Sequence, residues 1–258
     1  QYVNVFEKSI IDYNHANYRF RYFRQILSFL KTKSFIKLNN NSTATHAPVL
    51  IGIAKKDKDL VLLTGDLGFG IFDEFEKMFP GQYFNVGVAE QNLTSIASGL
   101  ALEGKKVFTY SLGNFPTLRC LEQIRNDACY HDLNVNIVAS GGGFSYGQLG
   151  MSHHATEDIS IMRALPNVTV VVPSNPWEAE HATRELYASE GVGYLRIDKT
   201  NGIQVNSENA FKIGQSITIQ NGHDVCFIVC GGIINEVIDA AKSLKDNGIS
   251  SEIISMHT

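Results

Sequence analysis

One acidic residue of the sequence stands between two apolar segments. Glu90 follows the stretch VGVA at 86–89 and precedes a run in which apolar residues recur at helical spacing up to Gly104, a plausible end of the helix. A carboxylate at that place has two interpretations. It is either a first-turn acid that complements the helix dipole or a desolvated acid that moves or shares a proton. The stretch itself leaves both open.

A second candidate region combines glycines with histidines. The stretch SGGGFSYGQLGMSHH at 140–154 follows an apolar run, and its three adjacent glycines allow a ligand to approach the backbone closely. Adjacent histidines cannot share one helix face, so we expect one of His153 and His154 in a site and the other packed or solvated. A further glycine-rich stretch, TGDLGFG at 64–70, has neither the spacing of a dinucleotide fingerprint nor the lysine of a P-loop.

These residues must be positioned by an alternation of strands and helices that starts near residue 48. The expected strands are 60–66, 106–111, 135–140, 168–174 and 193–198, and the expected helices are 72–79, 90–103, 116–129, 154–165 and 176–191. Ser174-Asn175-Pro176 is a typical start for the last of these helices. The pattern predicts an α/β fold in which helices cover both faces of a parallel sheet.

The chain divides into three expected regions. Residues 1–47 are an atypical basic extension with seven Lys/Arg and two acids, and we expect it to be poorly ordered, with a partner-binding or membrane-surface arm as the alternative. Residues 48–200 form the main α/β domain. Residues 201–258 hold a linker and a partial second α/β domain, which consists of a strand, a helix and a strand and looks truncated at Thr258.

Composition excludes several classes of protein. A net charge of −4 gives no sign of nucleic-acid binding, and no run of 18 apolar residues predicts a membrane span. Cys120, Cys129, Cys226 and Cys230 lack the spacing of metal ligands, so no metal site is expected in this chain. Cys226 and Cys230 flank an apolar strand and are expected to be small buried core residues. The cysteine pattern suits a reducing cytoplasm.

Several motifs together resemble one family. The segments GVAEQNLTSIASGLALEG, SLGNFPTLRCLEQIRND, GMSHHATEDISIMRALPN and VVVPSNPWEAE are similar in order and spacing to the pyrimidine-binding domain of the transketolase family of thiamine-diphosphate enzymes. The segment that begins FKIGQSITIQNG resembles the start of that family's C-terminal domain. The chain is most similar to the C-terminal subunit of split transketolases. The resemblance implies a thiamine-diphosphate-dependent transferase that moves a two-carbon ketol unit between sugar or sugar-phosphate substrates.

The resemblance assigns cofactor-binding roles to four residues. Glu90 matches the family's cofactor-activating glutamate, which bonds ring nitrogen N1′ of the aminopyrimidine and shares its proton when desolvation raises the pKa of the acid. Phe115 matches the aromatic residue that packs on this ring. Asp66 and Leu67 lie in a Gly-Asp-Leu turn where the family places an acid near the cofactor and the subunit interface.

Four further residues are implied as candidates for the substrate site. His153 matches the histidine of the family's Thr-His-Gln stretch, which helps to bind or protonate substrate oxygens, and His154 is its neighbour. Arg119 fits the family motif in LRCLEQ, with a role in shaping the site or the interface. Arg196, at a strand end, is expected to meet a phosphate, and a plain salt bridge is the alternative.

The chain departs from the family pattern near the substrate. Where the family often has Glu-Asp-Gly, this sequence has Gln148-Leu149-Gly150, so Leu149 replaces an aspartate that reads a substrate hydroxyl. Gly141 stands where transketolases carry a phosphate-contacting histidine, and Leu112 occupies a position that is often aromatic. These departures argue against ordinary sugar-phosphate substrates and leave cofactor activation intact.

The sequence also lacks the family's Gly-Asp-Gly motif, whose oxygen ligands hold the diphosphate and Mg²⁺. The Gly-Asp-Leu turn at Asp66 is not that motif. We therefore expect a partner, an N-terminal transketolase subunit that holds the diphosphate and the metal, in a homodimer or α2β2 assembly with the active site at an interface. The alternatives are chemistry like that of 1-deoxy-xylulose-5-phosphate synthase or the 2-oxo-acid dehydrogenase β subunit, and a non-catalytic scaffold subunit.

Overall fold

The structure is a computed structural model that describes residues 42–198 and 211–258. Most of the expected basic extension lies outside these residues, as does most of the expected linker. Helix α3 (Ser42–Ala54) begins six residues before the boundary that we placed at residue 48. The sequence pattern does not predict this helix because it contains Pro48, and proline disfavours the interior of a helix. The division near residue 200 stays a prediction.

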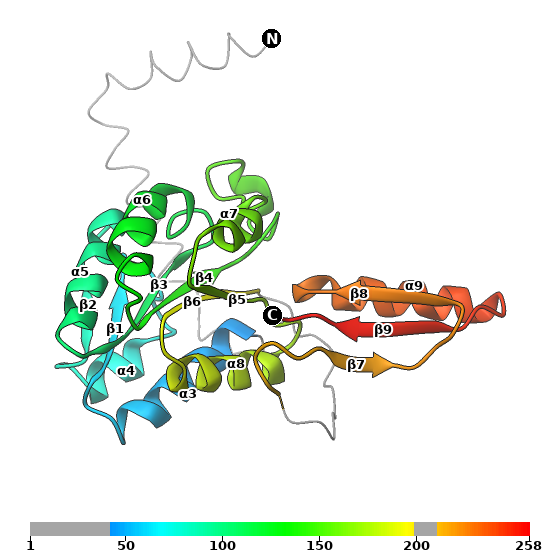
Figure 1. The fold of residues 1–258 in the computed structure, drawn as a ribbon, viewed down its shortest axis with the longest axis horizontal. Helices are drawn as coiled ribbons and strands as arrows, with labels where there is room; N and C mark the ends of the chain where they lie inside the picture. The colour runs from blue at the N-terminus through cyan, green and yellow to red at the C-terminus, as the bar shows by residue number, and fades with distance from the viewer. Residues whose placement is uncertain (1–41, 199–210) are drawn as a thin grey trace, which may run out of the picture. The chain divides into compact units, whose positions relative to one another are not determined.

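Six parallel strands form the main sheet, in the order β2-β1-β3-β4-β6-β5 (Figure 1). They are β1 (Leu60–Thr64), β2 (Tyr83–Asn85), β3 (Lys106–Leu112), β4 (Val135–Ser140), β5 (Val168–Val171) and β6 (Val192–Ile197). Every residue of β1 and β4 is buried, as expected for the inner strands of a covered parallel sheet. The predicted α/β fold is therefore confirmed, with the addition of the short strand β2.

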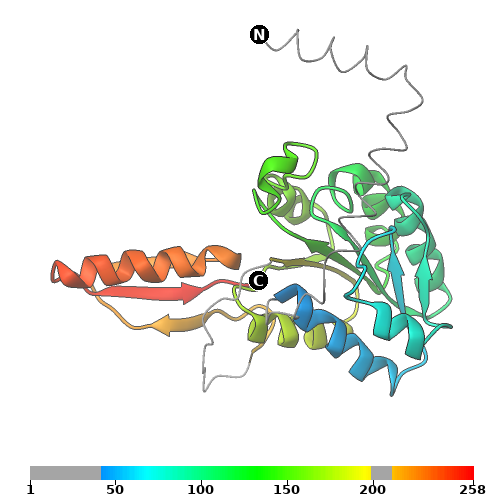
Figure 2. The same cartoon turned by 180° about the vertical axis from the view of Figure 1, so that it is seen from behind.

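Helices cover both faces of this sheet, as Figures 1 and 2 show. One face carries α3, α4 (Asp73–Met78) and α8 (Pro176–Ala188), and the other carries α5 (Glu90–Leu102), α6 (Leu121–Gln123) and α7 (Asp158–Ala164). Because side chains alternate along a strand, the neighbours Leu62 and Leu63 enter different apolar cores, one on each face.

Two signals in the sequence mark helix ends correctly. The Asn175 side chain accepts a hydrogen bond of 2.9 Å from the backbone of Glu178, and Pro176 is the first residue of α8. Gly104 follows the end of α5 with a φ of 84°, a conformation that glycine adopts without strain.

The two middle helices are shorter than expected. In place of one helix over 116–129, the chain forms η2 (Leu118–Cys120), α6 and the π-helix η3 (Ile124–Cys129). The helix expected at 154–165 begins only at Asp158. The first segment follows the carboxyl end of β3, and the second follows that of β4.

A second sheet of three strands follows, in the order β7-β9-β8. It contains β7 (Ile217–Gln220), β8 (Val225–Val229) and β9 (Ser251–Ser255), and α9 (Ile234–Asp246) packs on it through Ile234, Ile238 and Ala241. The prediction that Cys226 and Cys230 are buried is wrong, since both cysteines are exposed. Phe227 and Val229 of β8 pack toward α9, and Cys226 alternates to the other face of the sheet. None of the helices in the described parts of the chain is long and apolar enough to cross a membrane.

Candidate active site

Glu90 is the first residue of α5, and its side chain is buried to within 1% exposure. Gly65, at the end of β1, lies opposite, and a Cβ added there would be 3.5 Å from Cγ of Glu90. Among the described residues, the hydrogen bond to the carboxylate comes from Arg119 at Oε2, and Oε1 accepts none from the amides of the helix. Of the two interpretations of this acid, burial without a capping role favours the desolvated acid over the solvated first-turn acid.

Arg119 supplies the charge that balances Glu90. Its Nη1 donates a hydrogen bond of 2.7 Å to Oε2 of Glu90, although 45% of the arginine side chain is exposed. The Cζ atom of Arg119 lies 4.5 Å from the centroid of the Phe115 ring, which gives a cation–π contact. The other carboxylate oxygen, Oε1, is buried and has no hydrogen-bond donor among the residues that the structure describes.

His153 extends this group of side chains. Its ring lies edge-on to Phe115 with centroids 5.0 Å apart, and 6.0 Å from the ring of Tyr146. The neighbouring His154 turns elsewhere, since its Nε2 is 2.9 Å from the carbonyl oxygen of Gly147. The structure therefore brings Glu90, Arg119, Phe115 and His153 into one chain of contacts, which we call the Glu90 cluster. His154 does not join it.

The glycine-rich stretch returns His153 toward the sheet. Gly143 and Ala155 form an antiparallel bridge with two backbone hydrogen bonds of 2.7 and 2.9 Å, which closes the intervening loop. Gly141 has a φ of 80°, and a Cβ there would overlap the ring of Tyr146. Tyr146 thus fills the space of the missing side chain, so the departure that we noted at Gly141 is tied to a tyrosine five residues later.

Asp66 and Leu67 lie beside the cluster without joining it. Asp66 has a φ of 59°, and its carboxylate accepts a hydrogen bond of 3.0 Å from Asn85, whose own side-chain oxygen accepts one from the Asp66 backbone. The side chain of Leu67 is partly buried against the apolar core. Their roles toward a cofactor stay predictions.

Arg196 lies at the end of β6 and pairs with an acid of α7. Its Nε lies 3.3 Å from Oδ2 of Asp158, its side chain is only 14% exposed, and the hydroxyl of Tyr194 donates a 2.6 Å hydrogen bond to the same oxygen. Gly142 leaves the space that the guanidinium fills. The salt bridge that we gave as one alternative is present, and a contact with a phosphate stays a prediction.

Sequence reasoning missed several residues of the site. Asn85 orders the turn at Asp66 through a hydrogen bond. In the sequence, only its position in YFNVGVAEQN, close to Glu90, could have pointed to this role. Tyr146 and Gly65 have no distinctive signal at all. Cys120 lies beneath the cluster, where its thiol is directed at the carbonyl of Phe115 and burial raises its pKa to about 11. It is an inert packing group.

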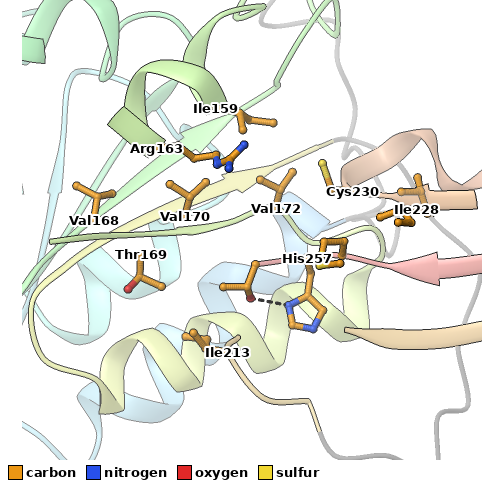
Figure 3. A pocket seen from close by; sticks show the side chains of 13 residues that line it. Ile159, Arg163, Val168, Thr169, Val170, Val172, Ile213, Ile228, Cys230 and His257 are labelled. Carbon is orange, nitrogen blue, oxygen red and sulfur yellow. Dashed lines mark hydrogen bonds between the residues drawn. The ribbon is translucent and has the colours of Figure 1, made fainter. Parts of the chain in front are cut away.

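A cavity of about 720 Å³ lies elsewhere (Figure 3). Its walls include Val168 and Val170 of β5, Arg163 of α7, and His257 near the end of the chain. No member of the Glu90 cluster lines it. The Glu90 cluster therefore lies outside this cavity. Within 42–198 and 211–258, no three His, Cys, Asp or Glu side chains converge as metal ligands would.

Residues 41–203 match the sequence model of the transketolase pyrimidine-binding domain, well over half of the chain. The chain belongs to the transketolase family. The resemblance predicted from the motifs is thereby confirmed.

Its relatives include chains of divided transketolases. The putative transketolase C-terminal section of Methanocaldococcus jannaschii is 41% identical over 217 residues, which are 83% of this chain and 69% of that protein. One subunit of the apulose-4-phosphate transketolase of Phocaeicola vulgatus is 31% identical over 210 residues, 80% of this chain and 67% of that protein.

Solved structures agree with this placement. A split-gene transketolase, described as an inactive β4 tetramer, superposes with a TM-score of 0.76 at 31% identity and covers 84% of this chain and 71% of that one. The transketolase of Campylobacter jejuni has a TM-score of 0.77 at 16% identity, covering 91% of this chain and 39% of that one, which shows a shared fold.

The transketolase pyrimidine-binding domain implies thiamine diphosphate, and the Glu90 cluster fits its aminopyrimidine ring. A buried acceptor without a donor carries a free-energy cost until a ligand supplies one, and Oε1 of Glu90 is such an acceptor. Phe115, which is only partly buried, offers an aromatic ring beside it. The residues present suit the pyrimidine end of the cofactor.

Proposed function

We propose that this chain is the C-terminal subunit of a two-chain transketolase, which transfers a two-carbon ketol unit between sugar or sugar-phosphate substrates. The observation that carries the proposal is the Glu90 carboxylate, buried to within 1% exposure, with Oε2 held by Arg119 and Oε1 without a donor among the described residues. Membership of the transketolase family and the divided relatives support it.

The residues of the cluster have distinct roles in this proposal. When bound, thiamine diphosphate supplies the nucleophilic carbon that adds to the carbonyl of a ketose donor. Oε1 of Glu90 accepts a hydrogen bond from the pyrimidine N1′ and shares that proton. Phe115 supports the ring by packing. The ring of His153, whose centroid lies 5.0 Å from that of Phe115, orients substrate oxygens and exchanges protons with them.

The rest of the site is proposed to lie on a second chain. Two relatives are named as subunits of transketolases for 6-deoxy-6-sulfo-D-fructose and for apulose-4-phosphate. By analogy we propose an N-terminal partner subunit that carries the diphosphate and Mg²⁺, in an α2β2 assembly or a dimer. A cytoplasmic location agrees with the four cysteines, all of which are free.

Co-expression with a chain that carries the Gly-Asp-Gly motif tests this function. We expect the complex to bind thiamine diphosphate and to use a ketose phosphate as donor. Replacing Glu90→Gln should lower kcat by about 10²–10⁴-fold, the range of a lost proton-transfer group, while the complex still assembles. Glu103→Gln changes an exposed acid at the end of the same helix and should leave the rate unchanged.

Other outcomes would point to the alternatives. Turnover of pyruvate without turnover of a ketose phosphate would favour chemistry like that of 1-deoxy-xylulose-5-phosphate synthase or a 2-oxo-acid dehydrogenase. A complex that assembles and binds no thiamine diphosphate would identify a scaffold subunit. A full rate in Glu90→Gln would contradict the role of this acid.

A further inference from the structure

Arg119 is the one residue of the Glu90 cluster whose role the family motif leaves open. It stands in η2, four residues after Phe115 in the chain and 29 residues after Glu90. Its Nη1 donates to Oε2 of Glu90 over 2.7 Å, a charge-assisted hydrogen bond of short length. The acid is buried while 45% of the arginine is exposed, so the arginine links the buried charge to the solvent side.

The guanidinium of Arg119 is itself held in place. Its Cζ lies 4.5 Å from the centroid of the Phe115 ring, and a planar guanidinium on an aromatic face loses much of its freedom to rotate. The turn that carries both residues is fixed by hydrogen bonds from the Thr117 hydroxyl to the Gly113 carbonyl and from the Cys120 backbone to the Thr117 carbonyl. Arg119 therefore approaches Glu90 from a defined direction.

The opposite oxygen of the carboxylate is left for another donor. Oε1 lies on the side of Gly65, where a Cβ would be only 3.8 Å away, and no donor in the described parts of the chain reaches it. A carboxylate held at one oxygen cannot turn freely, so the position of the second oxygen is fixed as well. Pre-positioning of this kind raises the rate of a step that depends on a single hydrogen bond.

We propose that Arg119 is a positioning residue for Glu90, which fixes Oε2 so that Oε1 meets the ring nitrogen of the cofactor. The inference rests on the proposed function, because it concerns the same acid and the same cofactor. It differs from the substrate-binding role that we considered from the sequence. A residue that binds substrate changes KM for the donor, whereas a residue that positions Glu90 changes proton exchange on the cofactor before any sugar binds.

The first test measures that exchange in the complex with its partner chain. Thiamine diphosphate alone is the probe, and the readout is the rate of deuterium exchange at its reactive carbon, followed by NMR after acid quench. In Arg119→Ala we expect this rate to fall about 10–100-fold, as for a displaced catalytic group, while KM for the donor changes less than about threefold. Arg119→Lys restores part of the rate, because an ammonium reaches Oε2 but does not lie flat on Phe115.

Arg125→Ala is the matched control. Arg125 is exposed, carries the same charge and lies only six residues further along, where it bonds Asn126. Its exchange rate should stay within about twofold of the wild type. A fall of the same size in Arg125→Ala would overturn the proposal, because the effect would then reflect net charge. So would an Arg119→Ala complex with normal exchange and a raised KM, which would make Arg119 a substrate-binding residue.

A second test needs no cofactor and no activity. In the full chain alone, Arg119→Ala leaves the Glu90 charge buried without a partner, so the melting temperature should fall by about 5 °C or more. Adding Glu90→Gln to that variant should remove most of the fall, because the buried charge is gone. Equal falls in the single and double variants would overturn the coupling between the two side chains.

The two tests separate this inference from the proposed function. If wild type exchanges the proton and Glu90→Gln does not, but Arg119→Ala exchanges normally, only the positioning role fails. If the wild-type complex neither binds thiamine diphosphate nor exchanges the proton, the proposed function fails and the inference fails with it.

Discussion

Two buried carboxylates of the main domain each pair with an arginine, and the two pairs differ in how far the arginine side chain is exposed to solvent. Glu90 pairs with Arg119, which is 45% exposed, and Asp158 pairs with Arg196, which is 14% exposed. Asp158 also accepts a hydrogen bond from the buried hydroxyl of Tyr194. The first pair opens toward solvent, and the second is enclosed by the domain.

Both acids also carry one oxygen without a donor among the described residues: Oε1 of Glu90 and Oδ1 of Asp158. An unpartnered oxygen is therefore not enough to identify a site. Glu90 differs from Asp158 in its surroundings. Its arginine partner is half exposed and contacts the partly buried ring of Phe115. The same kind of charge pair is therefore enclosed in one place and has a half-exposed arginine in the other.

The largest expected effect on stability comes from the enclosed pair. Asp158→Asn removes the charge that pairs with Arg196, whose side chain is only 14% exposed. We expect the free energy of unfolding to fall by ~3–5 kcal/mol, measured by urea denaturation of the full chain.

Asp239→Asn is the control, because the Asp239–Lys242 pair is 75% and 70% exposed and should contribute less than ~0.5 kcal/mol. A loss for Asp158→Asn no larger than this control would erase the difference between the enclosed and open pairs.

A buried histidine extends the comparison to a closed site without an ion pair. His46 of α3 is fully buried between Phe72 and Phe108, and burial lowers its pKa from 6.5 to about 3. Its Nδ1 is 2.9 Å from the Thr183 hydroxyl, which itself donates to the Ala179 carbonyl, so Nδ1 carries the proton and Nε2 is the bare nitrogen.

The sign of the pH dependence follows. Below pH 6.5, His46 is protonated in the unfolded chain, whereas in the folded chain it stays neutral until about pH 3. The contribution of His46 to the free energy of unfolding is therefore fully present above pH 6.5. It is lost as the pH falls, by up to ~1.4 kcal/mol per pH unit. His46→Gln should flatten this slope between pH 6 and pH 4, about the window of the shift, in denaturation curves. His131→Gln, at an exposed position, should leave it unchanged.

The smallest expected effect belongs to the open pair. Glu90→Gln in the isolated chain removes a buried charge and leaves Arg119, which remains solvated. The free energy of unfolding should change by less than ~1 kcal/mol in the same urea experiment. A loss as large as that of Asp158→Asn would show that Glu90 is a structural acid and would contradict the separation of the two pairs.

Much of this architecture could be predicted because it depends on local pattern. The apolar runs predicted five strands of the main sheet, and Asn175 and Gly104 marked helix ends through their own conformational preferences. Helix α3 and strand β2 were missed, since Pro48 disguises the first and the second has only three residues. Cys226 was misplaced because a short run of apolar residues does not reveal which face of the strand is covered.

The candidate site was predictable only in part, for a related reason. Glu90 could be placed at the start of a helix from spacing, but its pairing with Arg119 depends on the turn through η2, which no periodicity specifies. Spacing likewise offers no means to tell Arg196 from Arg119. Both follow apolar stretches, and only the packing shows that one is enclosed against Gly142 while the other is open.

The ion pair between Glu90 and Arg119 also bears on how such an assembly is made. Both charges belong to one chain, so the pocket is electrically balanced before any second chain arrives. The Glu90 charge is therefore not left buried without a partner on this chain, whether or not a second chain is bound.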